Sequence, residues 1–299
     1  MKCGIIGLGD IAQKAYLPVI TRMPGLELVL CTRKQETRER IGREYRIANQ
    51  VADIDALLDT GIEAAFVHTA TEAHYPIVRT LLEHGVHVYV DKPLAYTYQE
   101  CEELVELAEA RGKILMVGFN RRFAPMVADM KKIHNRTSVI IQKNRPNHPA
   151  SVRHVVYDDF VHVLDTVRFL CPGPVKTWSF DGRVEEGNLK HVLAKLSGDG
   201  FICVASMGRD FGVNEEIIEV TSPGNKWRIE GLTKTIHNTA NQEQVHNFGD
   251  WTPVLFRRGF NSILEHFLAS VAAGNTPNPS ARDSLITHKI CEQIVNSLE

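Results

Sequence analysis

The sequence predicts an α/β protein with a parallel, helix-covered sheet in residues 1–119 and an α+β domain in residues 120–299. Three observations support this prediction. A chain of 299 residues is long for one hydrophobic core and comfortable for two. Apolar runs alternate with helical patterns up to residue 119, and short runs separated by glycine-bearing turns dominate afterwards.

Strands in the first domain are expected where continuous apolar runs occur, at residues 3–7, 26–31, 63–69, 86–90 and 114–119. Helical patterns lie between them, at residues 11–23, 34–45, 72–85 and 97–112. Thr97 with Glu100 forms a capping-box pattern at the start of the last helix, and Gly85 and Gly112 are typical helix-stop residues. Continuous apolar strands that alternate with helices indicate a parallel sheet with both faces covered.

The second domain begins with an expected strand at residues 138–144 and an expected helix at 157–170. From residue 175 to about 235, short runs recur at a spacing of about ten residues with glycine in the turns, which is typical of an antiparallel sheet. Two helical patterns, at 261–274 and 280–299, follow this sheet.

The composition argues against several functional classes. With 43% hydrophobic and 23% charged residues and a formal charge of -2, the chain has no strong field for nucleic acid or an anionic membrane surface. No run approaches the roughly 20 apolar residues of a membrane span, and the N-terminus has no signal-peptide pattern. The six cysteines form no C-x-x-C pair, so neither a metal site nor a disulfide framework is indicated. We expect a cytoplasmic protein with reduced thiols, no metal, and no nucleic-acid or membrane partner.

The stretch "GIIGLGDIAQ" contains the dinucleotide-binding spacing G-x-G-x-x-A at Gly7, Gly9 and Ala12, between the first strand and the following helix. Gly7 permits the tight turn, Gly9 permits close approach of a pyrophosphate, and Ala12 permits close packing of the helix on the sheet. The helix N-terminus directs its positive dipole end at the phosphates. We therefore predict a Rossmann domain whose cofactor contacts include Asp10 and Ile11 of the same turn.

The end of the second strand discriminates between NAD and NADP. An acidic residue there would bind the ribose hydroxyls of NAD, but the sequence is "VLCTRKQ", with Thr32, Arg33 and Lys34 and no carboxylate. Arginine can pair with a 2′-phosphate and stack on adenine, so NADP is the preferred cofactor and NAD the alternative. If Arg33 and Lys34 only form a solvated helix start, the choice stays open.

Two stretches carry residues suited to proton chemistry. The first is Asp91-Lys92-Pro93 at the carboxyl end of the fourth strand, the edge where open α/β sheets bind their ligands. A lysine there can reach the nicotinamide ribose and a substrate hydroxyl. The structural alternative is a turn in which Pro93 ends the strand and Lys92 points into water.

The second stretch is "YDDFVHVLDTVRFL", in which Asp158, His162 and Asp165 share one face of an expected α-helix. A carboxylate beside an imidazole fixes its orientation and favours its charged form, which suits general acid–base catalysis. His162 is one of 13 histidines, so a surface or core role is the alternative. A metal pair of Asp158 with His162 is disfavoured because no further ligand clusters with it.

These stretches together resemble the Gfo/Idh/MocA family of oxidoreductases over nearly the whole chain. The resemblance rests on "GIIGLGDIA", on "VDKPLA" in place of the family's E-K-P, on "MVGFNRRFAP" at the domain junction, and on "DDFVHVLDTVRFL" in place of its D-x-x-x-H-x-x-D helix. The stretches "AQKAYLPVI", "HVYVDKPLA" and "GFNRRFAP" resemble in particular the MviM-like branch, sometimes called virulence factors.

The resemblance implies that Lys92, Asp158 and His162 form the catalytic group and that the Lys92–Pro93 bond is cis. Asp91 replaces the family's glutamate and is expected to orient the nicotinamide carboxamide side or the local turn. Further cofactor-lining positions implied by the family fall on Thr69, His74, Asn120 and Arg121. The family also implies an open, mostly antiparallel C-terminal sheet through which a homo-oligomer such as a dimer forms.

The sequence thus predicts an NAD(P)-dependent oxidoreductase that transfers hydride between nicotinamide and a CH–OH carbon. His162 takes the hydroxyl proton, Lys92 stabilises the developing negative charge on oxygen, and Asp158 orients His162. By resemblance, the partner is a small-molecule substrate, a sugar, cyclitol or related polyol. Further candidates for substrate contact are Asn144, Arg145 and His154. Two alternatives stay open: a non-catalytic NADP-binding sensor and a redox-assisted glycosidase of the same superfamily.

Overall fold

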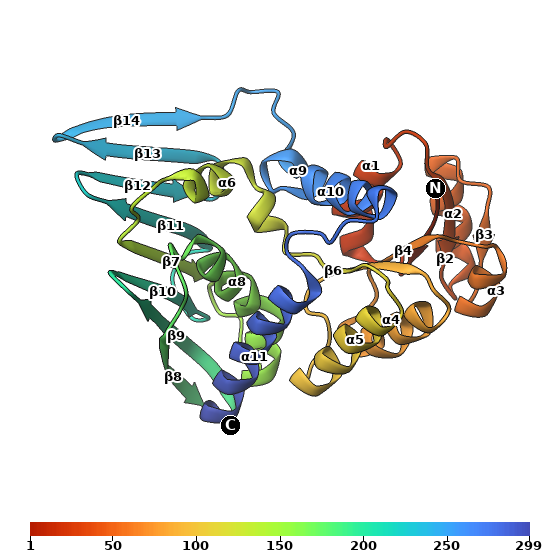
Figure 1. Cartoon of the computed structure of the whole chain (residues 1–299), viewed down its shortest axis with the longest axis horizontal. Coiled ribbons are helices and arrows are strands. Elements are labelled where there is room, and N and C mark those ends of the chain that lie inside the picture. Colours follow the sequence, from red (N-terminus) through yellow and green to blue (C-terminus); the bar gives the residue numbers. More distant parts are fainter. The chain divides into compact units, whose positions relative to one another are not determined.

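The computed structural model describes residues 1–299, which form two units (Figure 1). The first unit comprises Met1–Gly118 with Phe260–His288, and the second comprises Phe119–Gly259 with Lys289–Glu299. The chain leaves the first unit near the expected junction, but residues 260–288 return to it. The segment 260–288 thus groups with the first unit, whereas the sequence predicted one domain over residues 120–299.

Aromatic packing explains why residues 260–288 belong to the first unit. Phe267 of helix α10 (Phe260–Ala273) meets the rings of Phe66 and Tyr89 edge-on, at centroid distances of 5.5 and 5.7 Å. Phe260 likewise meets Tyr16 at 5.3 Å. Edge-to-face ring contacts stabilise packing beyond the area that they bury. Helix α10 therefore completes the hydrophobic core of the parallel sheet.

The first unit contains a six-stranded sheet in the order β3-β2-β1-β4-β5-β6, with every neighbouring pair parallel. This is the Rossmann order, as predicted. The strands are β1 (Lys2–Ile6), β2 (Glu27–Cys31), β3 (Gln50–Val51), β4 (Ala64–Val67), β5 (His87–Val90) and β6 (Leu115–Val117). Strand β3 was not predicted because a strand of two residues leaves no hydrophobic pattern.

Helices connect the strands of the first unit. They are a π-helical turn at Ala12–Tyr16, α1 (Leu17–Ile20), α2 (Gln35–Tyr45), α3 (Ile54–Asp59), a 3-10 turn at Thr71–Ala73, α4 (His74–Glu83) and α5 (Tyr98–Ala110). The predicted capping box of α5 is present: Thr97 Oγ1 accepts from the Glu100 N–H at 3.2 Å and donates to Glu100 Oε2 at 3.0 Å. This pairing satisfies one of the orphan N–H groups at the helix start.

The second unit contains an eight-stranded open sheet in the order β14-β13-β12-β11-β7-β10-β9-β8. All pairs are antiparallel except β7 with β10, which confirms the mostly antiparallel prediction. The strands are β7 (Ser138–Asn144), β8 (Thr177–Glu185), β9 (Asn188–Gly198), β10 (Phe201–Gly208), β11 (Glu215–Ser222), β12 (Asn225–Glu230), β13 (Lys234–Thr239) and β14 (Gln242–Asn247).

The two faces of the second sheet have different surroundings. Helix α8 (Val161–Leu170) packs on β7 and β10, and Val139, Ile141 and Cys203 are buried on these strands. The alternation of side chains along a strand directs Ile140 and Ile202 to the other face. These two residues are 42% and 49% exposed. One face of the sheet thus forms the core of the unit, and the other presents apolar side chains outward.

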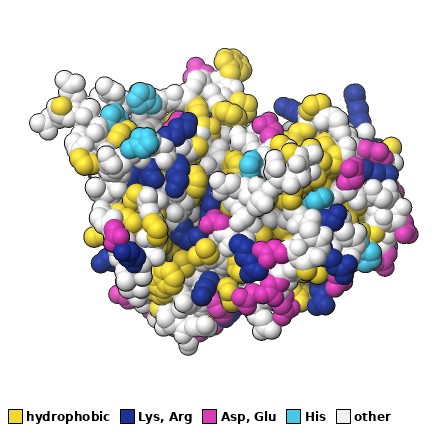
Figure 2. All heavy atoms as spheres, in the orientation of Figure 1, with side chains coloured by type: hydrophobic (Ala, Val, Ile, Leu, Met, Phe, Trp, Pro, Cys, Tyr) yellow, Lys and Arg dark blue, Asp and Glu magenta, His cyan; other side chains and the backbone are white.

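Several short helices complete the second unit: a 3-10 turn at Asn120–Phe123, α6 (Pro125–Lys132), α7 (Val152–His154), a π-helical segment at Val155–Phe160, α9 (Val254–Arg257) and the last turns of α11 (Ala281–Leu298). The helix expected at 157–170 therefore begins earlier and is not regular. No helix in either unit combines the length and hydropathy that crossing a bilayer requires. Basic and acidic side chains are mixed over the face shown in Figure 2.

Candidate active site

The glycine turn after β1 has the geometry of a nucleotide-binding turn. Gly7 has a φ of +83°, and a Cβ atom there would lie 2.7 Å from the backbone nitrogen of Thr69. Gly9 differs, because a Cβ atom there would meet nothing within 4 Å. The fold therefore requires glycine at Gly7, whereas the space beside Gly9 suits the close approach of a pyrophosphate. Ala12 is fully buried, as helix–sheet packing demands.

The neighbouring residues of the turn are more exposed. Asp10 forms an ion pair with Lys14 at 2.7 Å, one helical turn along, and its side chain is largely exposed. Ile11 is also exposed, which is unusual for an isoleucine that precedes a buried helix. Both side chains are therefore accessible to a ligand at the start of this helix. Their predicted contact with a cofactor requires this accessibility.

A cavity of about 440 Å³ lies at the carboxyl ends of the first strands, and it brings together Gly7, Thr32, Arg33 and Thr69. The buried Thr69 Oγ1 has no hydrogen-bond partner in the chain. The guanidinium of Arg33 makes no hydrogen bond or ion pair, whereas the carbonyl of Thr32 accepts from Arg38 Nη1 at 2.7 Å. These features fit a dinucleotide, because open hydrogen-bonding groups line the side on which Rossmann sheets hold one.

Sequence reasoning missed Asp53, which also lines this cavity. Asp53 follows β3 and is the N-cap of α3, where its Oδ1 accepts from the Ala56 N–H at 2.9 Å. The N-cap pattern of an aspartate before a short apolar run was a usable signal. Lys34 also precedes a helix, as the N-cap residue of α2, but its side chain does not cap it.

Lys92 lies at the carboxyl edge of β5, and the bond to Pro93 is cis, as the resemblance implied. His74 fixes this turn from the start of α4. Its Nδ1 is 2.8 Å from the carbonyl oxygen of Pro93, and its Nε2 is 3.1 Å from that of Thr69. His74 therefore links the lysine turn to the loop after β4, and its expected role in lining a cofactor stays a prediction.

Asp91 stabilises the same turn from inside the unit. Its Oδ1 accepts from the backbone N–H of Lys92 at 2.8 Å and from the hydroxyl of Tyr16 at 3.0 Å. The Tyr16 hydroxyl is also 3.3 Å from that of Tyr89. Burial raises the pKa of Asp91, although Lys92 opposes this effect. Of the two expected roles, the structure thus favours orientation of the local turn. The short aspartate side chain reaches back to the next backbone N–H.

His68 is a second residue of the first unit that sequence reasoning missed. It is 3% exposed and stacks on Tyr16 at a centroid distance of 3.7 Å. Neither of its ring nitrogens has a hydrogen-bond partner. Burial lowers its pKa to about 3, so the ring is neutral at ordinary pH. His68 therefore contributes a neutral aromatic surface next to Thr69.

The helix that carries Asp158 and His162 lies in the second unit. The prediction assumed a regular α-helix, but residues Val155–Phe160 form a π-helical segment, so the assumed α-helical spacing does not hold at Asp158. Asp158 Oδ2 pairs with His154 Nδ1 at 3.0 Å. The expected orientation of His162 by Asp158 therefore stays a prediction.

His162 is buried, and its Nε2 lies 3.4 Å from Nη1 of Arg121. Arg121 also holds Glu216 of β11 with two hydrogen bonds of 3.0 Å. Asn120 donates from Nδ2 to the carbonyl of Arg258 at 2.8 Å, and its Oδ1 accepts from Arg121 Nη1 at 3.3 Å. Asn120 and Arg121 thus shape the surroundings of His162 in the second unit. Their expected role in lining a cofactor stays a prediction.

Asp165, the third acid of the predicted face, has a structural role. It is 1% exposed, and Arg122 donates to its two oxygens at 2.8 and 2.6 Å. Such a buried, bidentate pair satisfies both charges and is unavailable for proton transfer. The predicted face of Asp158, His162 and Asp165 is therefore divided among three different partners.

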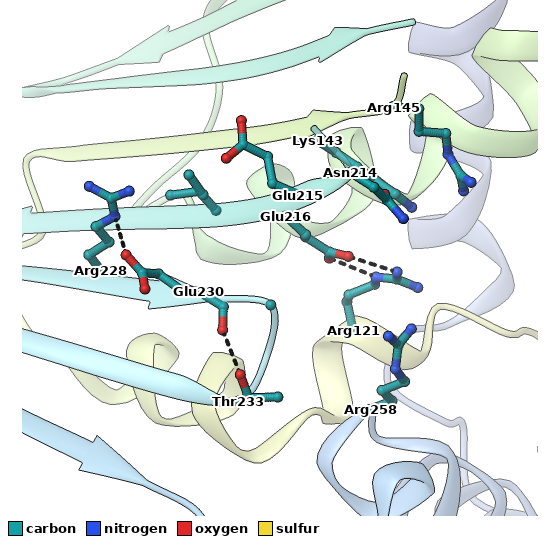
Figure 3. Close-up of a pocket in the computed structure, with 12 residues that line it drawn as sticks. Arg121, Lys143, Arg145, Asn214, Glu215, Glu216, Arg228, Glu230, Thr233 and Arg258 are labelled. Carbon is teal, nitrogen blue, oxygen red and sulfur yellow. Dashed lines mark hydrogen bonds and ion pairs between the residues drawn. The ribbon is translucent and has the colours of Figure 1, made fainter. Parts of the chain in front are cut away.

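A pocket of about 680 Å³ opens in the second unit next to Arg121 (Figure 3). Sequence reasoning proposed Arg145 here but missed Lys143, which is 7% exposed. Arg145 Nη2 pairs with Asp159 Oδ1 at 3.0 Å, and Asp159 also pairs with the buried Arg209. Burial alone would raise the pKa of Asp159, but these cations lower it to about 2. Asn144 is buried and donates to Glu215 Oε1 at 2.7 Å.

A sheet of Rossmann order with room for a pyrophosphate at its first turn places the chain among the nucleotide-binding proteins. The model of the Gfo/Idh/MocA oxidoreductase family, NAD-binding Rossmann fold, matches residues 1–119, and that of the YceM-like C-terminal domain matches residues 125–240. The chain belongs to the Gfo/Idh/MocA family.

Individual relatives agree with this assignment. YceM of Salmonella typhimurium is 32% identical over 98% of this chain and 97% of its own length. The scyllo-inositol 2-dehydrogenase (NAD(+)) of Bacillus subtilis is 26% identical over 99% of this chain and 94% of its own. The crystal structure of the dehydrogenase MviM from Clostridium difficile is 36% identical, with a TM-score of 0.95 over 100% of this chain and 99% of that one. The predicted resemblance is confirmed, and the chain is an oxidoreductase.

Proposed function

We propose that this oxidoreductase transfers a hydride between a nicotinamide nucleotide and a CH–OH carbon of a sugar, cyclitol or related small polyol. The observation that carries the proposal is the position of His162, whose Nε2 lies 3.4 Å from Arg121, a residue that lines the pocket of the second unit. The scyllo-inositol 2-dehydrogenase relative, matched over almost its full length, supports a polyol substrate.

His162 is suited to act as the base. A guanidinium N–H can only donate, so in the tautomer that accepts from Arg121 the facing ring nitrogen of His162 carries no proton. A neutral imidazole can take the proton of a substrate hydroxyl, and it returns that proton when a carbonyl is reduced. Lys92 supplies positive charge for the developing alkoxide. The bound nucleotide supplies the hydride chemistry, and Gly7, Gly9 and Thr69 would hold it.

The nucleotide in this proposal is NADP in preference to NAD. Arg33 lines the cavity of the first unit with a guanidinium that no protein group engages. A 2′-phosphate is the ligand that such a group pairs with in a bidentate manner. The family match establishes an NAD-binding Rossmann fold, so the preference for the phosphorylated form rests on Arg33.

A substrate panel tests the reaction. Purified protein is incubated with NADP or NAD and a series of cyclitols, sugars and sugar acids, and reduced nucleotide is followed by absorbance. We expect turnover with at least one polyol and a loss of about 10²-fold or more in kcat for Lys92→Met and for His162→Ala. Lys113→Met and the exposed His246→Ala are matched controls and keep full activity.

Three outcomes contradict the proposal. Unchanged turnover in both active-site variants would show that the reaction uses other residues. Nucleotide binding without turnover on any member of the panel would favour the sensor, and glycoside cleavage without net reduction would favour the glycosidase.

We further propose that the protein forms a homo-oligomer through the outer face of the second sheet. Ile140 and Ile202 lie on the central strands β7 and β10 and are exposed there. Exposed isoleucines at the centre of a sheet face are typical of protein–protein contact surfaces. Ile202→Arg is expected to shift the mass measured by light scattering to that of a monomer, whereas Val213→Arg, an equally exposed loop position, is expected to leave it unchanged.

A further inference from the structure

The pocket of the second unit has two chemically different ends (Figure 3). Arg121, Lys143, Arg145 and Arg258 are grouped at one end, and Glu216 is the carboxylate that lies with them. The carboxylate of Glu215 points away from this group. Arg121, Lys143, Arg145 and Arg258, together with Glu216, are called the cationic end of the pocket.

The carboxylates near the cationic end already have partners. Glu216 accepts two hydrogen bonds from Arg121, and Asp159 is paired with Arg145 and Arg209. The hydrogen bonds of these two carboxylates go to arginines, and none goes to the ammonium of Lys143 or the guanidinium of Arg258. Glu216 therefore acts on Lys143 and Arg258 through space, without a hydrogen bond to either.

Lys143 is the residue that indicates a ligand. It is 7% exposed, it lines the pocket, and its ammonium makes no hydrogen bond or ion pair within the chain. Its cross-strand neighbour in the register of β7 and β11 is Glu216, which pairs with Arg121 instead. A buried charge without a partner is costly, so natural proteins rarely keep one without a function.

Arg258 adds a second unpaired cation. It follows α9 and is exposed, and its guanidinium forms no ion pair, although its backbone carbonyl holds Asn120. Lys143 from the sheet and Arg258 from the loop after α9 thus face the same space from different elements. An anion with two or more oxygens could accept from both.

We propose that the cationic end of the pocket binds an anionic oxygen group of the substrate, a carboxylate or a phosphate. The inference rests on the proposed function, because it assumes that the polyol oxidised beside His162 occupies this pocket. It narrows the substrate class from neutral polyols to sugar acids or sugar phosphates. The volume of about 680 Å³ is ample for a monosaccharide with one such group.

Binding of three matched hexoses to the full-length protein tests the proposal without requiring turnover. D-glucuronate, D-glucose 6-phosphate and D-glucose share a ring and differ at C6, so calorimetric titration compares a carboxylate, a phosphate and a neutral hydroxyl. The titrations omit nucleotide, so that its phosphates do not compete. We expect at least one anion to bind ten-fold or more tightly than glucose. The anion that binds more tightly shows whether the site prefers a carboxylate or a phosphate.

Variants locate the binding to the cationic end. Lys143→Met is expected to weaken binding of the preferred anion by about 10- to 100-fold and to leave glucose unchanged. Arg258→Gln, at an exposed position where folding is not at risk, is expected to weaken it several-fold. Lys176→Met, which removes a surface lysine paired with Asp199, is the control and leaves binding unchanged.

The outcomes separate this inference from the proposed function. Equal affinities for glucose and both anions would overturn the inference, and so would anion binding that neither Lys143→Met nor Arg258→Gln weakens. Anion binding that depends on both residues, in a protein that turns over no polyol, would support the anion site and overturn the proposed function instead.

Discussion

Lys143 and Glu216 stand directly opposite each other in the register of β7 and β11, yet Glu216 gives its carboxylate to Arg121. Arg121 reaches this strand from the 3-10 turn that begins the second unit. The guanidinium fork takes both oxygens of Glu216, and the buried ammonium of Lys143 has no ion-pair partner. Lys143, Glu216 and Arg121 therefore contribute both to the stability of this region and to the charge that the pocket presents to a ligand.

Glu216→Gln should reduce stability at neutral pH. Burial alone would raise the pKa of Glu216, but Arg121, with smaller effects from Lys143 and Arg258, lowers it from 4.5 to about 2. A depressed carboxyl pKa contributes stability above pH 4.5, which is lost as the pH falls toward 2, with an upper size of about 3 kcal/mol. Urea unfolding between pH 6 and pH 3 should show a shallower decline for the variant than for wild type. Parallel profiles would contradict the pairing.

Lys143→Met should raise the free energy of unfolding while it weakens ligand binding. Burial, reinforced by Arg121 and Arg145 and opposed by Glu216 and Asp159, lowers the pKa of Lys143 from 10.5 to about 7. The unfolded state then binds more protons between pH 7 and 10.5, so wild-type stability rises with pH over this range. The variant lacks this rise. A gain of about 2–4 kcal/mol at pH 6 is expected from urea titrations; a loss of stability would show that the ammonium is satisfied.

Asp91→Ala should destabilise the first unit, because Tyr16 and the Lys92 N–H lose a common acceptor. Leaving such buried donors unpaired costs about 1–3 kcal/mol each. Asp91→Asn keeps an acceptor oxygen without the charge and should lose less than the alanine variant. Denaturant unfolding of both variants measures the difference. Equal stability of the two variants would show that the lost hydrogen bonds do not cause the destabilisation.

Gly9→Ala should separate cofactor binding from folding. A Cβ atom at this position meets no protein atom within 4 Å, so the midpoint of thermal unfolding should stay within about 2 °C. Binding of NADP should weaken by about ten-fold or more, because the methyl group takes the space of the pyrophosphate. Gly212→Ala, which also meets nothing, is the matched control for both measurements. Unchanged NADP affinity in Gly9→Ala would place the pyrophosphate elsewhere.

Arg33→Gln should change the cofactor preference more than the activity. Loss of a charged pair to the 2′-phosphate is expected to lower kcat/KM for NADP by about 10- to 100-fold and to leave the value for NAD nearly unchanged. Arg43→Gln, an exposed arginine on α2, is the control. An equal effect on both nucleotides would mean that Arg33 contacts a part that they share.

The first sheet and its glycine turn could be predicted from sequence because their signals are local. Continuous apolar strands, Gly7, Gly9 and the Thr97 cap each depend on neighbours within a few residues. The second sheet also left a signal that was not used. In β7, Lys143 follows Val139 and Ile141 at every second residue, so strand alternation places its side chain on the buried face.

Long-range contacts could not be predicted, because partners far apart in sequence leave no shared pattern. The pairs Tyr16–Asp91 and Arg121–Glu216 are separated by 75 and 95 residues. The π-helical segment before His162 likewise removed the regular spacing on which the predicted Asp158 face depended.

The sequence by itself determined the Rossmann sheet, the nucleotide turn and the family of the chain, since each follows from short-range periodicity and motif spacing. Tertiary structure decided that residues 260–288 complete the first unit, that Asp165 is structural and Asp91 holds its own turn. It also decided that Lys143 is left without an ion-pair partner. Which charges pair depends on the geometry of approach between distant elements, and that geometry exists only in the folded chain.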